Sequence, residues 1–270
     1  MKLAQASVVL TGASGGIGSA AARLLVYEGA KVLLVGRSTE VLMKLASELG
    51  AGAADRSRLD ALVVDITTEA GRAAICDVAQ ARNVNVLINN AGVPGFGALG
   101  DVARADIEAM VNTNLLAPML LTAQLLPQLL KQPRAQVINV GSTLARIGVP
   151  GFTAYGATKA GLRAFSESLR RELADTSVKI QYLAPRSVDT SFNDARAIAF
   201  NAATGSRSDP ASKVAAAIVE MIRSEQAERG MGWVEQIATR LNALCPRVLD
   251  GAFAKHRHAL LQTLPSSLNP

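Results

Sequence analysis

The stretch that decides the fold is Thr11-Gly12-Ala13-Ser14-Gly15-Gly16-Ile17-Gly18, between the apolar run Ser7–Leu10 and a helical stretch that ends near Gly29. A strand, a glycine-rich turn and a helix in this order leave backbone N–H groups free at the helix N-terminus, where the dipole favours anions. Glycine lets the chain turn tightly there because it has no Cβ. The block lacks the Lys-Ser/Thr ending of a P-loop. It predicts a pyrophosphate-binding turn, and the alternative is a merely flexible one.

Apolar, β-branched segments alternate with helix-length segments along most of the chain. This alternation predicts right-handed βαβ units, and continuously apolar strands predict a parallel sheet that is covered on both faces. We therefore expect an α/β fold with a doubly wound, Rossmann-like parallel sheet in three layers. The expected strands are Ser7–Leu10, Lys31–Val35, Ala61–Val64, Val84–Ile88, Gln136–Val140 and Val178–Leu183, with Glu228–Trp233 as a candidate seventh, and Glu40–Leu49 is an expected helix.

The bulk composition bounds the class of protein. With 270 residues, 49% hydrophobic and 19% charged, the chain suits one large domain and is not disordered throughout. Cys76 and Cys245 lie far apart, which argues against a disulfide scaffold or a zinc site and is compatible with the reducing cytoplasm. The net charge of +6 comes from scattered Lys and Arg residues with few aromatics, so nucleic-acid binding is not expected. No metal site is expected either.

Two segments have some features of membrane or targeting signals. Met1–Leu10 has too short an apolar stretch for a signal peptide. Val111–Leu130 has no charge over about the length of a membrane span, but it holds two asparagines, two glutamines and two prolines. A buried or subunit-facing helix is the favoured interpretation of that segment.

The end of the second expected strand, Val35-Gly36-Arg37-Ser38, indicates which dinucleotide binds. In dinucleotide folds an acidic residue in this loop holds the adenosine ribose hydroxyls of NAD. Here Gly36 and Arg37 occupy the loop, and a guanidinium suits the 2′-phosphate of NADP. The sequence therefore favours NADP (NADPH) over NAD, and the alternative is a solvated surface arginine.

Two further motifs follow expected strands. Asn89-Asn90-Ala91-Gly92 comes directly after the fourth strand, where small residues let the chain pass close to a nucleotide. Tyr155 and Lys159 are four residues apart, which places them on one face of a helix, with Ser142 upstream. The pair Tyr27 and Lys31 has the same spacing but runs from a helix end into a strand, so the spacing alone is weak evidence.

Taken together and in this order, these motifs and Asn114 resemble those of the classical short-chain dehydrogenases/reductases over roughly residues 5 to 190. The resemblance implies catalytic roles for Asn114, Ser142, Tyr155 and Lys159. The positions expected to bind the cofactor are Gly12, Ser14, Gly16, Ile17, Gly18, Arg37, Asp65, Ile66, Asn90, Ala91, Gly92, Tyr155, Lys159, Pro185, Val188 and Thr190.

The resemblance also implies a mechanism. Tyr155 would donate a proton to a carbonyl oxygen in reduction and remove it in oxidation, with Ser142 holding that oxygen. A free tyrosine titrates near ~10, and the charge of Lys159 about 4 Å away is large enough to lower the pKa of the phenol. Asn114 would bend its helix and anchor a water that links Lys159 to solvent. The implied function is an NADP(H)-dependent oxidoreductase that passes a hydride between the nicotinamide and a carbonyl or secondary alcohol.

Three features depart from the family pattern or lie outside it. Arg186 replaces a glycine that usually follows Pro185, which suggests a displaced nicotinamide or contact with an acidic substrate. Ser191–Pro210 lacks clear periodicity and is expected to be a loop, often a lid.

The third departure is the C-terminus. Residues 1–232 are expected to form the catalytic domain and residues 233–270 an amphipathic helical extension, packed over the substrate cleft or a subunit partner, or else on a membrane surface. His256 and His258 are expected to be solvated. A homo-oligomer, dimer or tetramer, is expected. The rival functions are a dinucleotide-binding sensor or scaffold without turnover, and a peripheral membrane reductase of lipid-like ketones.

Overall fold

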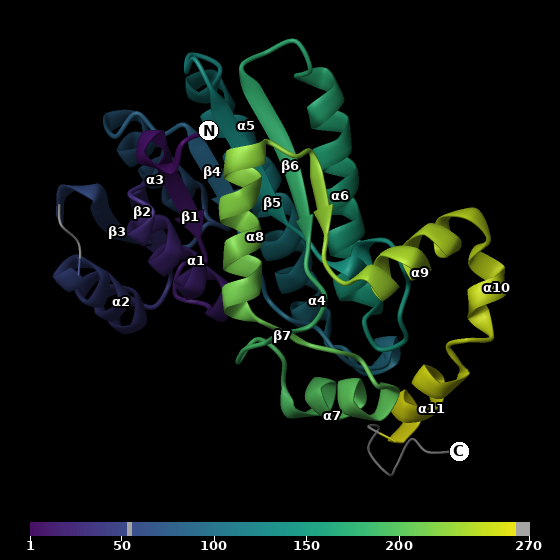
Figure 1. Cartoon of the computed structure of the whole chain (residues 1–270). Coiled ribbons are helices and arrows are strands. Elements are labelled where there is room, and N and C mark those ends of the chain that lie inside the picture. The colour runs from purple at the N-terminus through teal and green to yellow at the C-terminus, as the bar shows by residue number, and fades with distance from the viewer. Residues whose placement is uncertain (53–55, 263–270) are drawn as a thin grey trace.

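The computed structural model describes residues 1–52 and 56–262, and within them seven parallel strands form one sheet in the order β3-β2-β1-β4-β5-β6-β9 (Figure 1). The reversal of strand order on either side of β1 and β4 is that of a doubly wound sheet, as expected. The strands are β1 (Ser7–Thr11), β2 (Lys31–Gly36), β3 (Leu59–Val63), β4 (Val86–Asn89), β5 (Ala135–Val140), β6 (Val178–Ala184) and β9 (Glu228–Gly230).

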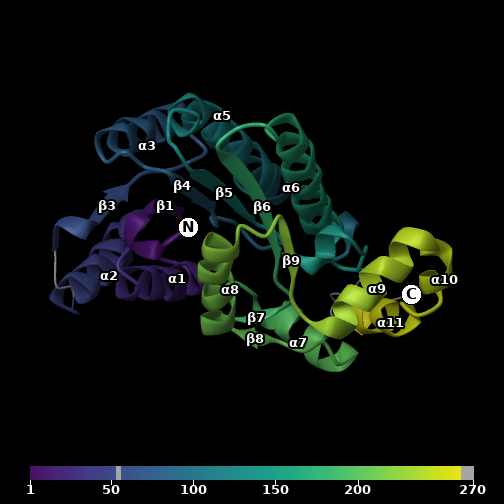
Figure 2. The same cartoon turned by 45° about the horizontal axis from the view of Figure 1, so that its top comes forward.

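Helices cover both faces of the sheet and complete three layers (Figures 1 and 2). One face carries α1 (Gly16–Tyr27), α2 (Thr39–Gly52) and α8 (Ala211–Ser224), and the other carries α3 (Glu69–Ala81), α5 (Ala117–Leu129) and α6 (Thr153–Glu172). Short 3-10 turns lie at Leu3–Gln5, Arg56–Arg58, Leu99–Asp101 and Thr143–Ala145.

The two helical layers bury alternate residues of the same strands. In β1, Val8 and Leu10 belong to the core under α1 and α8, whereas Val9 belongs to the core under α3 and α5. Successive strand side chains point to opposite faces, so a strand that is covered on both faces needs apolar residues throughout. This requirement explains why these strands appear in the sequence as continuous apolar runs.

The uncharged segment lies in one long helix, in which α4 (Arg104–Val111) leads through a π-helical turn (Asn112–Leu116) into α5. By length and composition alone, Arg104–Leu129 could cross a membrane. Its inner face packs against the sheet through Leu121 and Leu125, which are buried. Leu116 and Leu120 on its outer face are exposed.

The segment expected to be a loop contains a helix, so that expectation was wrong in part. Ser191–Pro210 follows β7 (Val188–Asp189), contains α7 (Ala195–Thr204) and ends in β8 (Asp209–Pro210). Strand β8 pairs with β7. The Asp194 side chain caps α7 by accepting a hydrogen bond from the Ala197 N–H at 2.7 Å, and Gly205 ends the helix with φ +77°. We call residues 188–210 the flap.

The C-terminal region is helical as far as residue 262: α9 (Trp233–Leu244), α10 (Pro246–Asp250) and α11 (Ala254–Gln262). Residues 263–270 of the expected extension lie outside the described residues. The extension reaches out beyond β9 and returns so that α11 lies beside α7 (Figures 1 and 2). Ala259 and Leu260 of α11 pack with Phe200 of α7.

Candidate active site

A cleft of about 970 Å³ opens at the carboxyl ends of the central strands and runs from the glycine-rich turn to the flap. Ligands of open α/β sheets bind at this edge, where the strand order reverses. Every expected site residue except Asn114 lines this cleft. Asn114 lies directly behind it, because a Cβ added to Gly92 would stand 3.1 Å from the Asn114 Oδ1.

The glycine-rich turn leaves no room for side chains. Gly12 has φ +64°, and a Cβ there would stand 2.7 Å from the Cα of Ala91. A Cβ on Gly16 would overlap the Thr190 side chain at 2.2 Å, and one on Gly18 would overlap the Gly12 carbonyl oxygen at 2.0 Å. Helix α1 begins at Gly16, so its free N–H groups lie at the end of the cleft. This glycine cradle fits the pyrophosphate of a dinucleotide.

The Asn-Asn-Ala-Gly segment ties β4 to the glycine-rich turn. The Asn90 side chain donates hydrogen bonds to the carbonyl oxygens of Thr11 and Gly12 at 3.0 and 3.1 Å, and the Thr11 hydroxyl accepts one from the Ala91 N–H at 3.1 Å. Asn89 instead donates into the layer beneath, to Asn139 Oδ1 at 2.8 Å. These bonds fix the floor of the cleft.

Arg37 and Asp65 lie at the mouth of the cleft, after β2 and β3. The side chain of Arg37 is exposed. Although burial opposes it, hydrogen bonds from the backbone and side chain of Thr67, helped by the charge of Arg37, lower the pKa of Asp65. The Thr67 donors stand 2.8 and 2.7 Å from Asp65 Oδ1. Asp65 is therefore ionised and held in place, and the Arg37 guanidinium is available for an anionic ligand.

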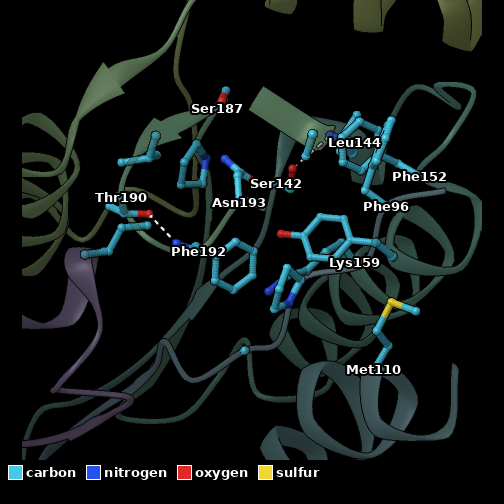
Figure 3. A pocket seen from close by; sticks show the side chains of 18 of the residues that line it. Phe96, Met110, Ser142, Leu144, Phe152, Lys159, Ser187, Thr190, Phe192 and Asn193 are labelled. Atoms are coloured by element: carbon cyan, nitrogen blue, oxygen red, sulfur yellow. Dashed lines mark hydrogen bonds between the residues drawn. The ribbon is translucent and has the colours of Figure 1, made fainter. Parts of the chain in front are cut away.

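Ser142, Tyr155 and Lys159 come together in the middle of the cleft. Ser142 follows β5, and its hydroxyl oxygen accepts a hydrogen bond from the Leu144 N–H at 3.1 Å (Figure 3). The Ser142 side chain also lies near the Tyr155 phenol and acts on its pKa. Lys159, one turn further along α6, donates to the Val140 carbonyl oxygen at 3.0 Å, with its Nζ 5.8 Å from the centre of the Tyr155 ring.

Asn114 lies in the π-helical turn between α4 and α5, a type of distortion that is frequent at functional sites. Its amide forms a pair with the backbone of Val93: the Val93 N–H donates to Oδ1 at 2.8 Å, and Nδ2 donates to the Val93 carbonyl at 3.0 Å. Nδ2 also lies 3.4 Å from the Thr158 hydroxyl. Asn114 thus joins the irregular helix turn to the wall behind Lys159.

The pKa of Tyr155 is shifted in the direction opposite to the expected lowering. Burial raises the pKa of Tyr155, and the neighbouring Ser142 side chain only partly opposes that effect. Burial lowers the pKa of Lys159 to about 8. At neutral pH the phenol is protonated and the lysine is mostly charged, which is the pair of states that proton donation to a carbonyl oxygen requires.

Arg186 lines the cleft, but its guanidinium is paired with carboxylates of the protein, and a contact with an acidic substrate stays a prediction. It forms two hydrogen bonds to the buried Asp209 of β8, at 2.9 and 2.8 Å, and one to Glu235 of α9 at 3.3 Å. Two carboxylates offset the one guanidinium charge. The residue therefore links the end of β6 to the flap and to the C-terminal extension.

Sequence reasoning missed the substrate side of the cleft, which is aromatic. Phe96, Phe152 and Phe200 form a cluster with ring centres 5.0 to 5.9 Å apart, and Phe192 of the flap packs against Tyr155. In Figure 3, Ser142 lies between Phe96 and Phe152 on one side and Phe192 on the other. These residues come from separate segments with no shared motif, so the sequence carried no signal for them.

The two C-terminal histidines have different environments. His258 is exposed, as expected. His256 is half-buried and lines the cleft, with its Nδ1 buried, so the expectation of a solvated side chain was wrong for this residue.

Comparisons with known proteins show what the chain is similar to. The family model described as short chain dehydrogenase matches residues 6–199. A serine 3-dehydrogenase of Agrobacterium fabrum is 38% identical over 191 residues, covering 69% of this chain and 73% of that protein. An NADP-dependent 3-hydroxy acid dehydrogenase of Salmonella typhi is 36% identical over 196 residues, covering 70% and 75%. The solved structure of actinorhodin polyketide ketoreductase with NADPH is 28% identical, with a TM-score of 0.75, and covers 86% of this chain and 97% of that one.

Proposed function

The chain belongs to the short chain dehydrogenase family of oxidoreductases, and from that premise we propose that it is an NADPH-preferring carbonyl reductase or alcohol dehydrogenase. The observation that carries the proposal is the group in the middle of the cleft: a protonated phenol, Tyr155, that lies near Ser142 and one helical turn from the ammonium of Lys159. This group lies in the same cleft as the glycine cradle.

The coenzyme preference is proposed from the cleft mouth and from relatives. The two residues next to Arg37 in the chain, Gly36 and Ser38, are not acidic. The exposed guanidinium of Arg37 suits a ribose 2′-phosphate. A dehydrogenase of Salmonella typhi at 36% identity is named as NADP-dependent. The residues proposed to hold the dinucleotide are the glycine cradle, Arg37, Asp65, the Asn90–Gly92 segment and the Pro185–Thr190 segment.

When bound, NADPH supplies the hydride that reduces a carbonyl carbon. The Ser142 hydroxyl holds the carbonyl oxygen, and Tyr155 gives that oxygen its phenolic proton as negative charge develops there. The Tyr155 O–H bond breaks and the O–H bond of the alcohol product forms. The charge of Lys159 then stabilises the phenolate that remains, and oxidation of an alcohol runs through the same proton transfer in reverse.

The coenzyme proposal is tested by measuring kcat/KM for NADPH and NADH with a panel of ketones, aldehydes and acyl thioesters. The wild type should prefer NADPH, and Arg37→Ala should lose roughly ten- to a hundredfold of that preference, because a charge-assisted hydrogen bond contributes about 1.5–3 kcal/mol. Arg104→Ala, which removes an arginine with a 92% exposed side chain on α4, is the matched control and should leave the ratio unchanged. Equal use of both coenzymes would contradict the proposal.

Assembly and location are also proposals. We infer a homo-oligomer, because the outer face of the long α4–α5 helix exposes Val111, Leu116 and Leu120 in a row at helical spacing. We place the protein in the cytoplasm, because its two cysteines are free. Gel filtration with light scattering measures the subunit number.

A further inference from the structure

We propose that His256 of α11 determines substrate specificity, by hydrogen-bonding a polar group at the far end of an aryl ketone whose ring lies on the aromatic wall. The inference rests on the proposed function and deepens it. It commits to a substrate class: a flat hydrophobic carbonyl compound with a hydroxyl group remote from the carbonyl.

The aromatic wall begins at the proposed proton donor. Phe152 packs edge-on against Tyr155 at 6.5 Å, and Phe200 packs against Phe152 at 5.9 Å and against Phe96 at 5.0 Å. Ring faces and edges favour offset and tilted contacts with another ring, so such a wall suits a planar aromatic body better than a branched polar one. A substrate with its carbonyl at Tyr155 extends along this wall towards Phe200.

His256 stands at the other end of the wall. Its ring packs at 5.8 Å against Phe200 and at 5.0 Å against Phe253, and both His256 and Phe253 line the cleft. The imidazole is therefore part of the continuous ring surface that starts at Tyr155.

The imidazole has unused hydrogen-bonding capacity. Its Nδ1 is buried and has no partner among residues 1–52 and 56–262, so a ligand reaches the ring through Nε2, which makes no hydrogen bond to those residues either. Burial, with a smaller contribution from the charge of Lys255, lowers the pKa of His256, so the ring is neutral at neutral pH and can either donate or accept. A ligand hydroxyl at Nε2 gains a hydrogen bond. A substrate that lacks the hydroxyl does not form this bond, and the site discriminates by that difference.

His256 is supplied by the C-terminal extension, beyond residues 6–199 that the family model matches. Helix α11 is held against the flap by the packing of Ala259 and Leu260 on Phe200. The position of His256 is therefore tied to the flap that forms the same wall.

The experiment uses phenyl alkyl ketones with one to three methylenes between ring and carbonyl, each with and without a para-hydroxyl group. We compare kcat/KM within each pair for the full-length enzyme with NADPH. At the best-fitting spacer the wild type should prefer the hydroxylated ketone by about tenfold, because one hydrogen bond is gained. In His256→Phe, which keeps the ring packing, the preference should disappear, and the ratio of kcat/KM within each pair is the quantity compared. His256→Gln, whose amide reaches the position of Nε2, should restore part of the preference.

His258→Phe is the matched control, because His258 lies on the same helix and is exposed; it should keep the full preference. Binding of the same ketone pairs is measured in parallel by calorimetry, so the inference is tested even where no ketone is turned over. A preference that survives in His256→Phe, or no preference at any spacer in both turnover and binding, overturns the proposal for His256. Absence of turnover together with a His256-dependent binding preference overturns the proposed reductase function alone.

Discussion

Tyr155 and Lys159 acquire their chemistry from where α6 places them, since the same spacing recurs elsewhere in the chain without it. Tyr27 and Lys31 are also four residues apart, but Tyr27 is 86% exposed at the end of α1. Tyr155 instead lies in the cleft near Ser142, and Lys159 is buried and donates a hydrogen bond to the Val140 carbonyl. Burial and hydrogen bonding therefore distinguish the two pairs.

The two tyrosines give a matched pair of variants. Tyr155→Phe keeps the ring packing against Phe152 and Phe192 but removes the proton, so kcat for ketone reduction should fall by about 10²–10⁴-fold with little change in coenzyme binding. Tyr27→Phe should leave kcat unchanged. Steady-state kinetics and coenzyme titration of both variants make the comparison. A Tyr155→Phe enzyme with near-normal kcat would exclude the phenol as the proton donor.

Lys159 should impose a pH dependence on reduction. Its pKa is lowered by burial to about 8, so its charge is present below that pH and is lost as pH rises through it. Because the charge stabilises the Tyr155 phenolate, kcat/KM for reduction should fall above about pH 8.

Lys159→Arg tests whether Lys159 causes this fall in kcat/KM, since a guanidinium keeps its charge across the pH range that is measured. The variant should be less active, but its kcat/KM should no longer fall between pH 8 and pH 9.5, as measured with one ketone and NADPH at fixed ionic strength. If kcat/KM falls at the same pH in both enzymes, a group other than Lys159 is responsible for the fall.

At the scale of elements, an ion-pair cluster holds the flap. Arg186 after β6 pairs with Asp209 of β8 and Glu235 of α9, and Lys213 of α8 adds a further bond to Asp209 at 2.9 Å. The Asp209 side chain is 4% exposed, so its two cationic partners compensate for its burial. The Asp209 carboxylate thus joins the end of the flap to Arg186 and to α8, and Arg186 extends the cluster to α9.

Asp209→Asn should destabilise the protein by about 3 kcal/mol, because Arg186 loses its principal partner in a largely buried site. Its hydrogen bonds with Arg186 lower the pKa of Asp209 from the ordinary value of 3.8, despite the opposing effect of burial. Because the pKa is lower in the folded state, the ionised Asp209 carboxylate contributes its full stabilisation of the folded protein above pH 3.8. That contribution is lost as pH falls through the lower pKa of the folded state.

Urea unfolding at pH 7 and at decreasing pH measures this difference. The difference in the free energy of unfolding between wild type and Asp209→Asn should have its full value at pH 7 and should decrease below pH 3.8. Asp189→Asn, at an exposed position in the paired strand β7, is the control and should cost little. Equal stability of Asp209→Asn and wild type at pH 7 would show that the cluster does not hold the flap.

The elements differed in how far the sequence predicted them. The central strands were predicted to within a few residues, because a strand covered on both faces must be apolar throughout. Helix α7 was missed, since apolar residues lie on its exposed side, as Ile198 does, as well as on its buried side, so its hydrophobic periodicity is weak. Its signals were the cap residues Asp194 and Gly205, which local inspection could have found.

At the scale of the whole molecule, the predictable part of the site is the part built at strand ends. Gly12, Asn90 and Ser142 each follow a strand, so a parallel sheet necessarily brings them to one edge. The aromatic wall and His256 depend on how the flap and the extension fold back over that edge. Contacts between segments so distant in sequence leave no local pattern, and the same reason explains why the partners of Arg186 were not predicted.

The cleft joins two halves that the chain builds separately: a glycine cradle at β1 and an aromatic chamber closed by α7 and α11. The account requires one ligand in each half, with a reaction between them beside Tyr155. Absorbance at the reduced ring alone does not show where the hydrogen goes.

The most direct test follows the hydrogen itself, with NADPH that carries deuterium at the transferable position and a phenyl alkyl ketone as acceptor. Mass spectrometry of the product should show an alcohol that carries deuterium on the former carbonyl carbon, at a yield that matches the NADPH consumed. The same reaction with Tyr155→Phe should give almost none. An alcohol without deuterium, or NADPH consumed with the ketone left unchanged, would contradict hydride transfer to a carbonyl carbon.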